Sequence, residues 1–441
     1  MLKHIADYYT RFSFWQKLQL FYIVFELFNS CVYYQFKIIP NIIIIESFAL
    51  ITFICFVGYY QKHTDELKNP RFACVLLLLF LLITAIAFRF STYTDYKYGK
   101  AIKTLLIQFI WLILLFFCPK AKTKSEADCS TLFKNFAFQI VILFTLCVSL
   151  SSLLLWIIVI PLNFDISAYT SLDVVQDGRL CALYFNSDLA GITSLISMLL
   201  AVNLLSQKQT EFLKINRISI IIQLCVLFLS GCRSAILPFS LIITFLIIKY
   251  LRKKYTTINV RKLLIVLCAC ALFLQVILTI LRMPNYEFSG KSLEVILNKL
   301  TASRYSLWKE AIILSMSSPI WGNGLYTMVA LAKSNLVSTS VIIERNYDLC
   351  HNLYISALYS TGITGLICVI ILTKSIVDQF NIRRCYMNSN IFLSEMFIAF
   401  SLFIYSLFNP AILFVTDFPA PVFWLLIGYI IAQNNYHLKR N

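Results

Sequence analysis

Apolar runs, each about 20 residues long, dominate the chain and alternate with shorter polar segments. A helix of that length crosses the roughly 30 Å of hydrocarbon in a bilayer. Helices and closed barrels are the structures that satisfy their backbone hydrogen bonds there. The pattern predicts an all-α polytopic membrane protein with about twelve transmembrane helices, at 18–36, 38–60, 72–90, 101–118, 136–161, 188–206, 218–231, 234–251, 263–281, 352–373, 391–408 and 411–432.

Composition changes this picture little but excludes a soluble globular protein. The chain is 59% hydrophobic and 13% charged, whereas soluble domains average about 25% charged residues. A net charge of +17 would suggest nucleic acid for a soluble protein. Here it is better explained by the lysine and arginine excess of cytoplasmic loops, so no nucleic acid partner is expected.

The basic residues also orient the chain. With the N-terminus in the cytoplasm, 24 lysines and arginines fall on that side and 7 on the short loops opposite. Both termini are therefore predicted to be cytoplasmic. No cleavable signal is apparent, so the first span is expected to remain as an anchor. Residues 1–441 then form a single integral membrane domain with two substantial periplasmic loops, 162–187 and 282–350, the second between spans nine and ten.

The long loop contains its own helical pattern. Apolar residues recur at helical spacing across 292–317, which predicts one amphipathic helix: Leu293, Ile296, Leu297, Leu300, Leu307, Ala311 and Leu314. Pro319 and the sequence Gly322-Asn323-Gly324 are expected to end it.

The candidate chemistry lies on the outer side. His351 is the single histidine predicted there, and Arg179, Arg233 and Arg304 stand close to apolar segments. Arginine is costly in hydrocarbon unless it has a partner, and its planar fork matches the oxygens of a diphosphate. Each arginine alone could be a snorkelling or ion-paired residue. Together with the histidine they predict a site for an anionic lipid head group beside an acid–base residue.

Missing motifs narrow the chemistry further. The chain has no Asp-x-Asp sequence, no phosphate-binding Gly-x-x-x-x-Gly-Lys loop and no dinucleotide fingerprint. We therefore expect no metal, no nucleotide and no cofactor. Gly362 and Gly365, three residues apart, are expected to let a second helix approach closely.

The segment His351-Asn352, followed after nine residues by Gly362-x-x-Gly365, resembles the signature near the C-terminal end of the O-antigen ligase family. Three weaker features resemble the wider ligase and polymerase superfamily, in the expected order: Gly178-Arg179 with Asn186 and Ala190, the turn from Ser230 to Ser234, and Arg304 to Trp308 followed by Gly322-Asn323-Gly324. In that superfamily serine often precedes the motif arginine, whereas this chain has Cys232 there.

The resemblance implies a GT-C-like, inverting, metal-independent glycosyltransferase in a Gram-negative inner membrane. Such an enzyme transfers O-antigen polysaccharide from undecaprenyl diphosphate to the lipid A–core oligosaccharide at the periplasmic face. His351 would be catalytic, and Arg233 and Arg304, with Arg179, would bind the diphosphate. The supporting residues would be Asn352, Gly362, Gly365, Trp308 and Asn186.

Three alternatives remain open. An O-antigen polymerase uses the same donor and shares the topology and the arginines. A protein O-oligosaccharyltransferase usually carries a larger C-terminal domain. A lipid-linked oligosaccharide flippase is a different class, and Glu26, Glu46 and Glu395 lie in or near spans, where transporters place ionisable residues. However, the chain shows no paired halves of the kind common in transporters.

Overall fold

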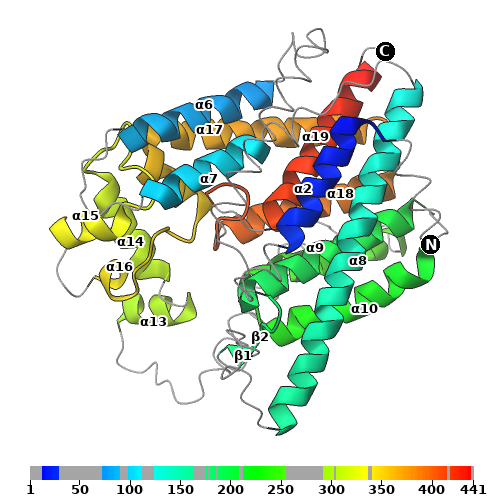
Figure 1. Ribbon diagram of the computed structural model, residues 1–441, viewed down its shortest axis with the longest axis horizontal. Coiled ribbons are helices and arrows are strands. Elements are labelled where there is room, and N and C mark those ends of the chain that lie inside the picture. Colours follow the sequence, from blue (N-terminus) through cyan, green and yellow to red (C-terminus); the bar gives the residue numbers. More distant parts are fainter. Residues whose placement is uncertain are drawn as a thin grey trace.

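The computed structural model describes residues 12–28, 72–89, 98–111, 124–162, 175–176, 179–184, 186–207, 212–254, 292–301, 304–335, 340–414 and 418–438. In this part of the chain the fold is helical, with one antiparallel pair of short strands (Figure 1). The elements are α2 (Phe14–Phe28), α6 (Phe72–Arg89), α7 (Tyr98–Trp111), α8 (Lys124–Leu162), β1 (Val175–Gln176), β2 (Arg179–Leu180), α9 (Ser187–Ser206), α10 (Leu213–Ser230), α11 (Arg233–Lys254), α13 (Leu293–Leu300), α14 (Arg304–Ser315), α15 (Met328–Asn335), α16 (Val341–Glu344), α17 (Leu353–Arg384), α18 (Ser389–Ser406) and α19 (Pro419–Leu438).

The all-α membrane class is confirmed. Among the described residues, six helices are long and apolar enough to cross a bilayer: Asp128–Val159, Ser187–Ser206, Leu213–Ser230, Arg233–Tyr250, Leu353–Arg384 and Ser389–Ser406. The predicted spans 18–36, 72–90, 101–118 and 411–432 overlap α2, α6, α7 and α19. Spans 38–60 and 263–281 lie outside the described residues, so the total of twelve stays a prediction.

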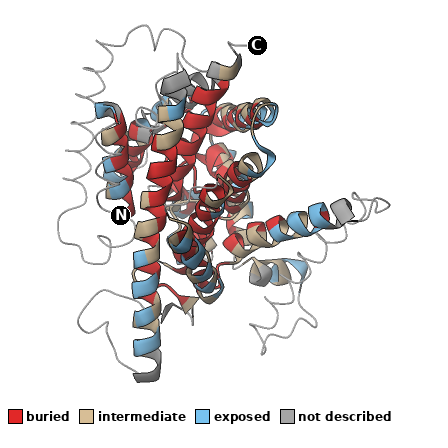
Figure 2. Ribbon diagram, turned by 90° about the vertical axis from the view of Figure 1, so that its right-hand side faces the viewer, coloured by how far each residue is buried: buried red, intermediate tan, exposed pale blue. Residues whose placement is uncertain are grey.

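Helix α9 is the most buried of the six candidate spans, and Figure 2 shows that buried residues gather in the interior of the bundle. In the most apolar stretch of α9, 83% is buried inside the protein, whereas only 28% is buried in the corresponding stretch of α11, Arg233–Tyr250. Helix α9 packs against α8, α10, α11 and α18. Small polar residues on α9 suit this position, because they allow close helix packing and bond to neighbouring helices. Ser197, for example, lies 2.7 Å from the hydroxyl of Thr145 on α8.

The prediction of a single amphipathic helix at 292–317 is wrong. The structure has two helices there, α13 and α14, which belong to a group of helices on one side of the molecule together with α15 and α16 (Figure 1). Polar side chains explain the division, since they satisfy backbone groups at the start of a new helix. The Asn298 side chain accepts a hydrogen bond from Ser306 N at 2.8 Å, and the Thr301 hydroxyl accepts one from Tyr305 N at 3.1 Å.

The interpretation of the glycine pair also needs correction. Gly362 has φ +66° and ψ −167° and divides α17 into two helical segments. Among the described residues, its nearest neighbours are Ile320 and Gly322, in the loop that follows α14, and not a second helix. A Cβ on Gly362 would lie 2.2 Å from the carbonyl oxygen of Ile320, so only glycine fits. Gly365 makes room for Thr361, whose Oγ1 would lie 1.8 Å from an added Cβ.

The break in α17 is an exchange of backbone hydrogen bonds. In an uninterrupted helix the carbonyls of Tyr359 and Ser360 would accept from the N–H groups four residues later. Here they accept from the loop, and the helix donates back to it. The four bonds are Asn323 N to Tyr359 O at 2.9 Å, Gly324 N to Ser360 O at 3.0 Å, Ile363 N to Pro319 O at 2.8 Å and Thr364 N to Ile320 O at 3.5 Å. The loop is therefore fixed to α17 without leaving these backbone groups unpaired.

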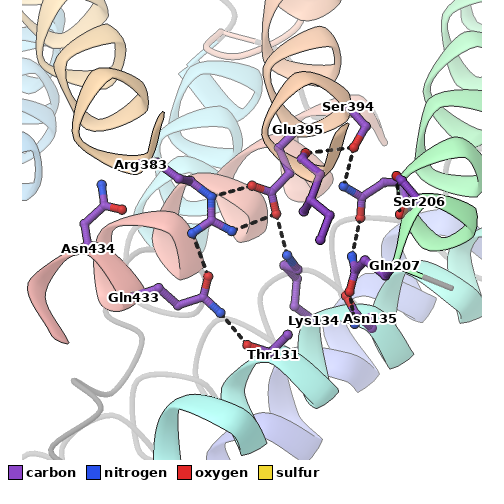
Figure 3. A network of polar contacts seen from close by, with 12 residues as sticks. Thr131, Lys134, Asn135, Ser206, Gln207, Arg383, Ser394, Glu395, Gln433 and Asn434 are labelled. Atoms are coloured by element: carbon purple, nitrogen blue, oxygen red, sulfur yellow. Dashed lines mark hydrogen bonds and ion pairs between the residues drawn. The ribbon is translucent and has the colours of Figure 1, made fainter. Parts of the chain in front are cut away.

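A buried ionic cluster joins α8, α17, α18 and α19 (Figure 3). Glu395 accepts from Lys134 Nζ at 2.5 Å and from Arg383, whose Nη2 lies 2.9 Å from the carboxylate. Arg383 also donates to Gln433 at 2.7 Å, and Gln433 donates to Thr131 at 2.7 Å. These contacts give Glu395 two cationic partners inside the protein, which favours a structural role over the transport role that the flippase alternative would assign to it.

Candidate active site

Asp188, in the first turn of α9, brings two of the predicted arginines together. Arg304 Nη2 lies 3.4 Å from Asp188 Oδ2, and Arg179 Nη1 lies 4.0 Å from Asp188 Oδ1. The three side chains remain 19%, 30% and 32% exposed for Arg304, Arg179 and Asp188. The pairs are therefore open enough for the arginines to exchange this carboxylate for another anion.

Local structure explains why these groups meet. Asn186 caps α9, and its side chain accepts a hydrogen bond from Leu189 N at 2.7 Å. A carboxylate in the first turn, such as that of Asp188, is favoured by the helix dipole. Arg179 lies in β2, where it pairs with Gln176 of β1, and β2 contacts both α9 and α10. The strand pair thus holds Arg179 beside the start of α9.

Asn409, which follows α18, connects the arginine and histidine sides. Its Oδ1 lies 2.8 Å from His351 Nδ1 and accepts a hydrogen bond from Arg304 Nη2 at 3.2 Å. Its Nδ2 donates to Asp188 Oδ2 and to Tyr405 OH, both at 3.3 Å. One amide therefore contacts His351, Arg304 and Asp188.

His351 is held in place from several sides. Its φ of +49° lies in the left-handed region, immediately before the cap of α17. Asn352 is that cap, because its Oδ1 accepts from Tyr354 N at 3.0 Å and from Ile355 N at 3.1 Å. Asn352 also donates to Leu407 O at 2.9 Å, which ties the start of α17 to the end of α18. The Tyr347 ring and the imidazole pack in a T-shaped arrangement, with their ring centroids 5.2 Å apart.

The surroundings lower the pKa of His351. Burial is the main cause, and the positive charge of Arg304 acts in the same direction. The hydrogen bond with Asn409 and the charge of Asp188 oppose the effect without cancelling it. The imidazole is therefore neutral at pH 7 and able to accept a proton.

Trp308 links the arginine helix to the histidine. It lies one turn after Arg304 on α14, and its Nε1 donates to Cys350 O at 2.9 Å. Because Cys350 directly precedes His351, this bond fixes the distance between the two functional segments.

Arg233 begins α11 at the turn that includes Cys232. That turn packs closely on α9, because a Cβ added to Gly191 would lie 2.3 Å from Cys232 Cβ. Gly191 follows Asp188 by about one helical turn, so Arg233 begins near the Asp188 end of α9. Gly362 and Gly365 do not belong to the polar cluster and instead shape α17 as described above. Within the described ranges, no group of three or more His, Cys, Asp or Glu residues could hold a metal ion.

Sequence reasoning missed Asp188 and Asn409 as site residues. The hydrophobic pattern assigns Asp188 only to the start of the predicted span 188–206. Asn409 stands in a very short turn between the last two predicted spans, next to Pro410. A polar residue in so short an apolar turn is the one signal that could have indicated it.

These features define a helical membrane protein with a cluster of arginine, aspartate and histidine at helix ends. Comparison with protein families gives a match to the family described as O-Antigen ligase over residues 218–370. The matched segment includes Arg233, Arg304, Trp308, His351 and the glycine pair. The resemblance to the O-antigen ligase family is thereby confirmed. No curated protein matches the chain significantly.

Proposed function

We propose that this protein is an O-antigen ligase. It transfers a polysaccharide from undecaprenyl diphosphate to the lipid A–core oligosaccharide, with inversion at the anomeric carbon and without a metal. The observation that carries this proposal is the convergence of Arg179, Arg304 and His351 on one bonded cluster around Asp188 and Asn409. These residues come from four parts of the chain that are distant in sequence, and the family match covers two of those parts, the ones that contain Arg304 and His351.

The arginines serve the donor. A diphosphate develops negative charge as it leaves the sugar, and fixed guanidinium groups stabilise that charge. Arg304 and Arg179 share a single carboxylate, so the cluster has one more positive charge than negative before a ligand arrives. Arg233, on the neighbouring turn, is proposed as the third contact with the diphosphate.

The histidine serves the acceptor. A sugar hydroxyl is a weak nucleophile, and a neutral imidazole can remove its proton as the oxygen attacks the anomeric carbon. The new bond joins that oxygen to the anomeric carbon. The bond from the anomeric carbon to the diphosphate oxygen breaks, and its electron pair leaves with undecaprenyl diphosphate.

We also propose the orientation and location that this reaction requires. Both termini lie in the cytoplasm of a Gram-negative bacterium, and the loops 162–187 and 282–350 lie in the periplasm, above the inner membrane. Reporter fusions within 292–335 should be active with a periplasmic reporter. Activity of a cytoplasmic reporter there would remove the proposed donor and acceptor from reach of the site.

The decisive experiment replaces His351. His351→Gln and His351→Ala, in a strain that lacks the native gene, should each reduce transfer to the core by about 10²–10⁴-fold because the base is lost. His437→Gln is the matched control, since His437 stacks on Tyr386 near the end of α19. Membrane levels of all variants are measured by immunoblot. Near-normal transfer by His351→Gln would exclude a base at this position.

The pH dependence provides a second test. Because burial lowers the pKa of His351, the neutral form persists below pH 6.5. Transfer by the wild type should therefore be retained at pH 6.5 and fall only at more acidic pH. A decline that begins above pH 7 would contradict the proposed state of the imidazole.

The same deletion strain separates ligase from polymerase. Loss of a ligase leaves bare core, with polymerised glycan still attached to the lipid carrier. Loss of a polymerase leaves core that bears a single repeat unit. Gel analysis of the lipopolysaccharide reports which product accumulates.

A further inference from the structure

The orientation of the Asn409 side chain is determined by its charged neighbours. Arginine only donates hydrogen bonds, so the atom 3.2 Å from Arg304 Nη2 must be the amide oxygen. An ionised carboxylate only accepts, so the atom 3.3 Å from Asp188 Oδ2 must be the amide nitrogen. Both contacts give the same orientation of the Asn409 amide, with Oδ1 toward Arg304 and Nδ2 toward Asp188.

This orientation sets the tautomer of His351. The amide oxygen carries no proton, so the 2.8 Å contact between Asn409 Oδ1 and His351 Nδ1 requires the proton to reside on Nδ1. In the neutral imidazole the lone pair is then on Nε2. Within the described part of the chain, Nε2 has no hydrogen-bond partner.

We propose that Asn409 is a positioning residue that fixes His351 as the Nδ1–H tautomer, so that Nε2 is the atom that removes the acceptor proton. This inference rests on the proposed function. In the transfer step, the Nε2 lone pair takes the hydroxyl proton, the hydroxyl oxygen bonds to the anomeric carbon, and the diphosphate leaves with the electron pair. Asp188 and Tyr405 hold the amide nitrogen and thereby keep Oδ1 toward the imidazole.

The charged and titratable groups that face His351 give the expected direction of each pH effect. Arg304 on α14 lowers its pKa, whereas Asp188 on α9 and the Asn409 hydrogen bond raise it. The Tyr347 ring packs against the imidazole in a T-shaped arrangement. Asn409→Ala removes a contribution that raises the pKa of His351, and Asn409→Asp adds a carboxylate that raises it further.

The experiment measures transfer by the purified full-length protein in lipid nanodiscs across a range of pH. Its substrates are undecaprenyl-diphosphate-linked O-antigen and lipid A–core prepared from the source bacterium. Asn409→Ala should lower kcat by about tenfold or more, with a smaller change in the KM for the donor, because the base loses its correct tautomer. Asn409→Asp should recover part of kcat, since a carboxylate also accepts from Nδ1.

The acidic limb of the pH profile is the more specific readout. It should move to lower pH in Asn409→Ala and to higher pH in Asn409→Asp. Asn388→Ala is the matched control, because Asn388 caps the start of α18 and is exposed. Loss of that cap should leave the pH profile unchanged. Opposite shifts are not expected from a loss of folding, which would lower activity equally at every pH.

Two outcomes separate the inference from the proposed function. If His351→Gln is inactive while Asn409→Ala has wild-type kcat and an unmoved profile, the positioning role is wrong and the proposed base stands. If His351→Gln is itself active, the proposed base fails, and with it the role of Asn409.

Discussion

Two polar clusters lie toward opposite ends of α17, and they are built in contrasting ways. The distance along the helix from Gly362 to Arg383 is roughly 30 Å, about the hydrocarbon thickness of a bilayer. Lys134, Arg383 and Glu395 are at most 1% exposed, and Glu395 contacts both cations at short distance. At the other end, the Arg304–Asp188 and Arg179–Asp188 pairs are 3.4 and 4.0 Å long and partly exposed.

The difference in burial assigns different roles to similar residues. In the cluster of Lys134, Arg383 and Glu395, called the inner cluster, the contacts come from four helices, α8, α17, α18 and α19 (Figure 3). The side chains of Arg383 and Glu395 are fully buried. Its charges cannot be given to a ligand without leaving an unpaired charge in the bundle. In the cluster of Arg179, Arg304 and Asp188, called the outer cluster, the ion pairs are long and partly exposed. An incoming anion can therefore replace Asp188 at a small cost in free energy. The inner cluster therefore stabilises the bundle, and the outer one is suited to binding and catalysis.

The largest expected effect comes from breaking the inner cluster. Glu395→Ala leaves Lys134 and Arg383 without their anion, which should cost about 3–5 kcal/mol in free energy of unfolding. Thermal unfolding in detergent, followed by fluorescence-detected size exclusion, measures the loss. Glu294→Ala is the control, because its pair with Lys309 is about half exposed and should contribute at most about 1 kcal/mol. Equal stability of the two variants would refute a structural role for the inner cluster.

The second prediction concerns the kink between the clusters. Gly362→Ala places a Cβ 2.2 Å from Ile320 O at a backbone conformation that disfavours other residues. The expected cost is about 1–3 kcal/mol of strain, with loss of transfer as the loop moves away from α17. Gly99→Ala in α7 is the matched control, because open space surrounds it, and should be neutral or slightly stabilising. If both alanine variants transfer glycan normally, the loop contact does not position the site.

The third prediction tests the outer cluster alone. Arg304→Lys keeps the charge but loses the guanidinium, whose Nη2 contacts both Asp188 and Asn409. Transfer should fall by about 10- to 100-fold, as expected for one charged hydrogen bond, while the unfolding temperature changes little. Arg345→Lys, at an exposed arginine after α16, should leave transfer unchanged. A large drop in stability with Arg304→Lys would instead show that this cluster, too, supports the fold.

The smallest expected effect is that of a chelator. Diphosphate charge is assigned to arginines here, and the one carboxylate of the outer cluster, Asp188, already pairs with two of them. Transfer should therefore be unchanged in excess EDTA. Restoration of a lost activity by magnesium or manganese would require carboxylate ligands that the proposed site does not use.

Several properties of this protein follow from sequence alone because they depend on neighbours in the chain. Apolar runs of helical length predict the membrane class, and ten of the twelve predicted spans overlap helices in the described residues. The i to i+4 spacing places Trp308 on the same face as Arg304. The histidine–glycine signature predicts the resemblance to the O-antigen ligase family, and the match to residues 218–370 confirms that resemblance.

Other properties depend on contacts between residues that are far apart in sequence. Asn409 meets His351 across 58 positions, and Lys134 meets Glu395 across 261. Spacing carries no information about such pairs, because only the packing of several helices brings them within bonding distance. Likewise, the sequence indicates that Gly362 needs a close neighbour. The tertiary structure alone decided that this neighbour is a loop whose backbone replaces two of the helix's own hydrogen bonds.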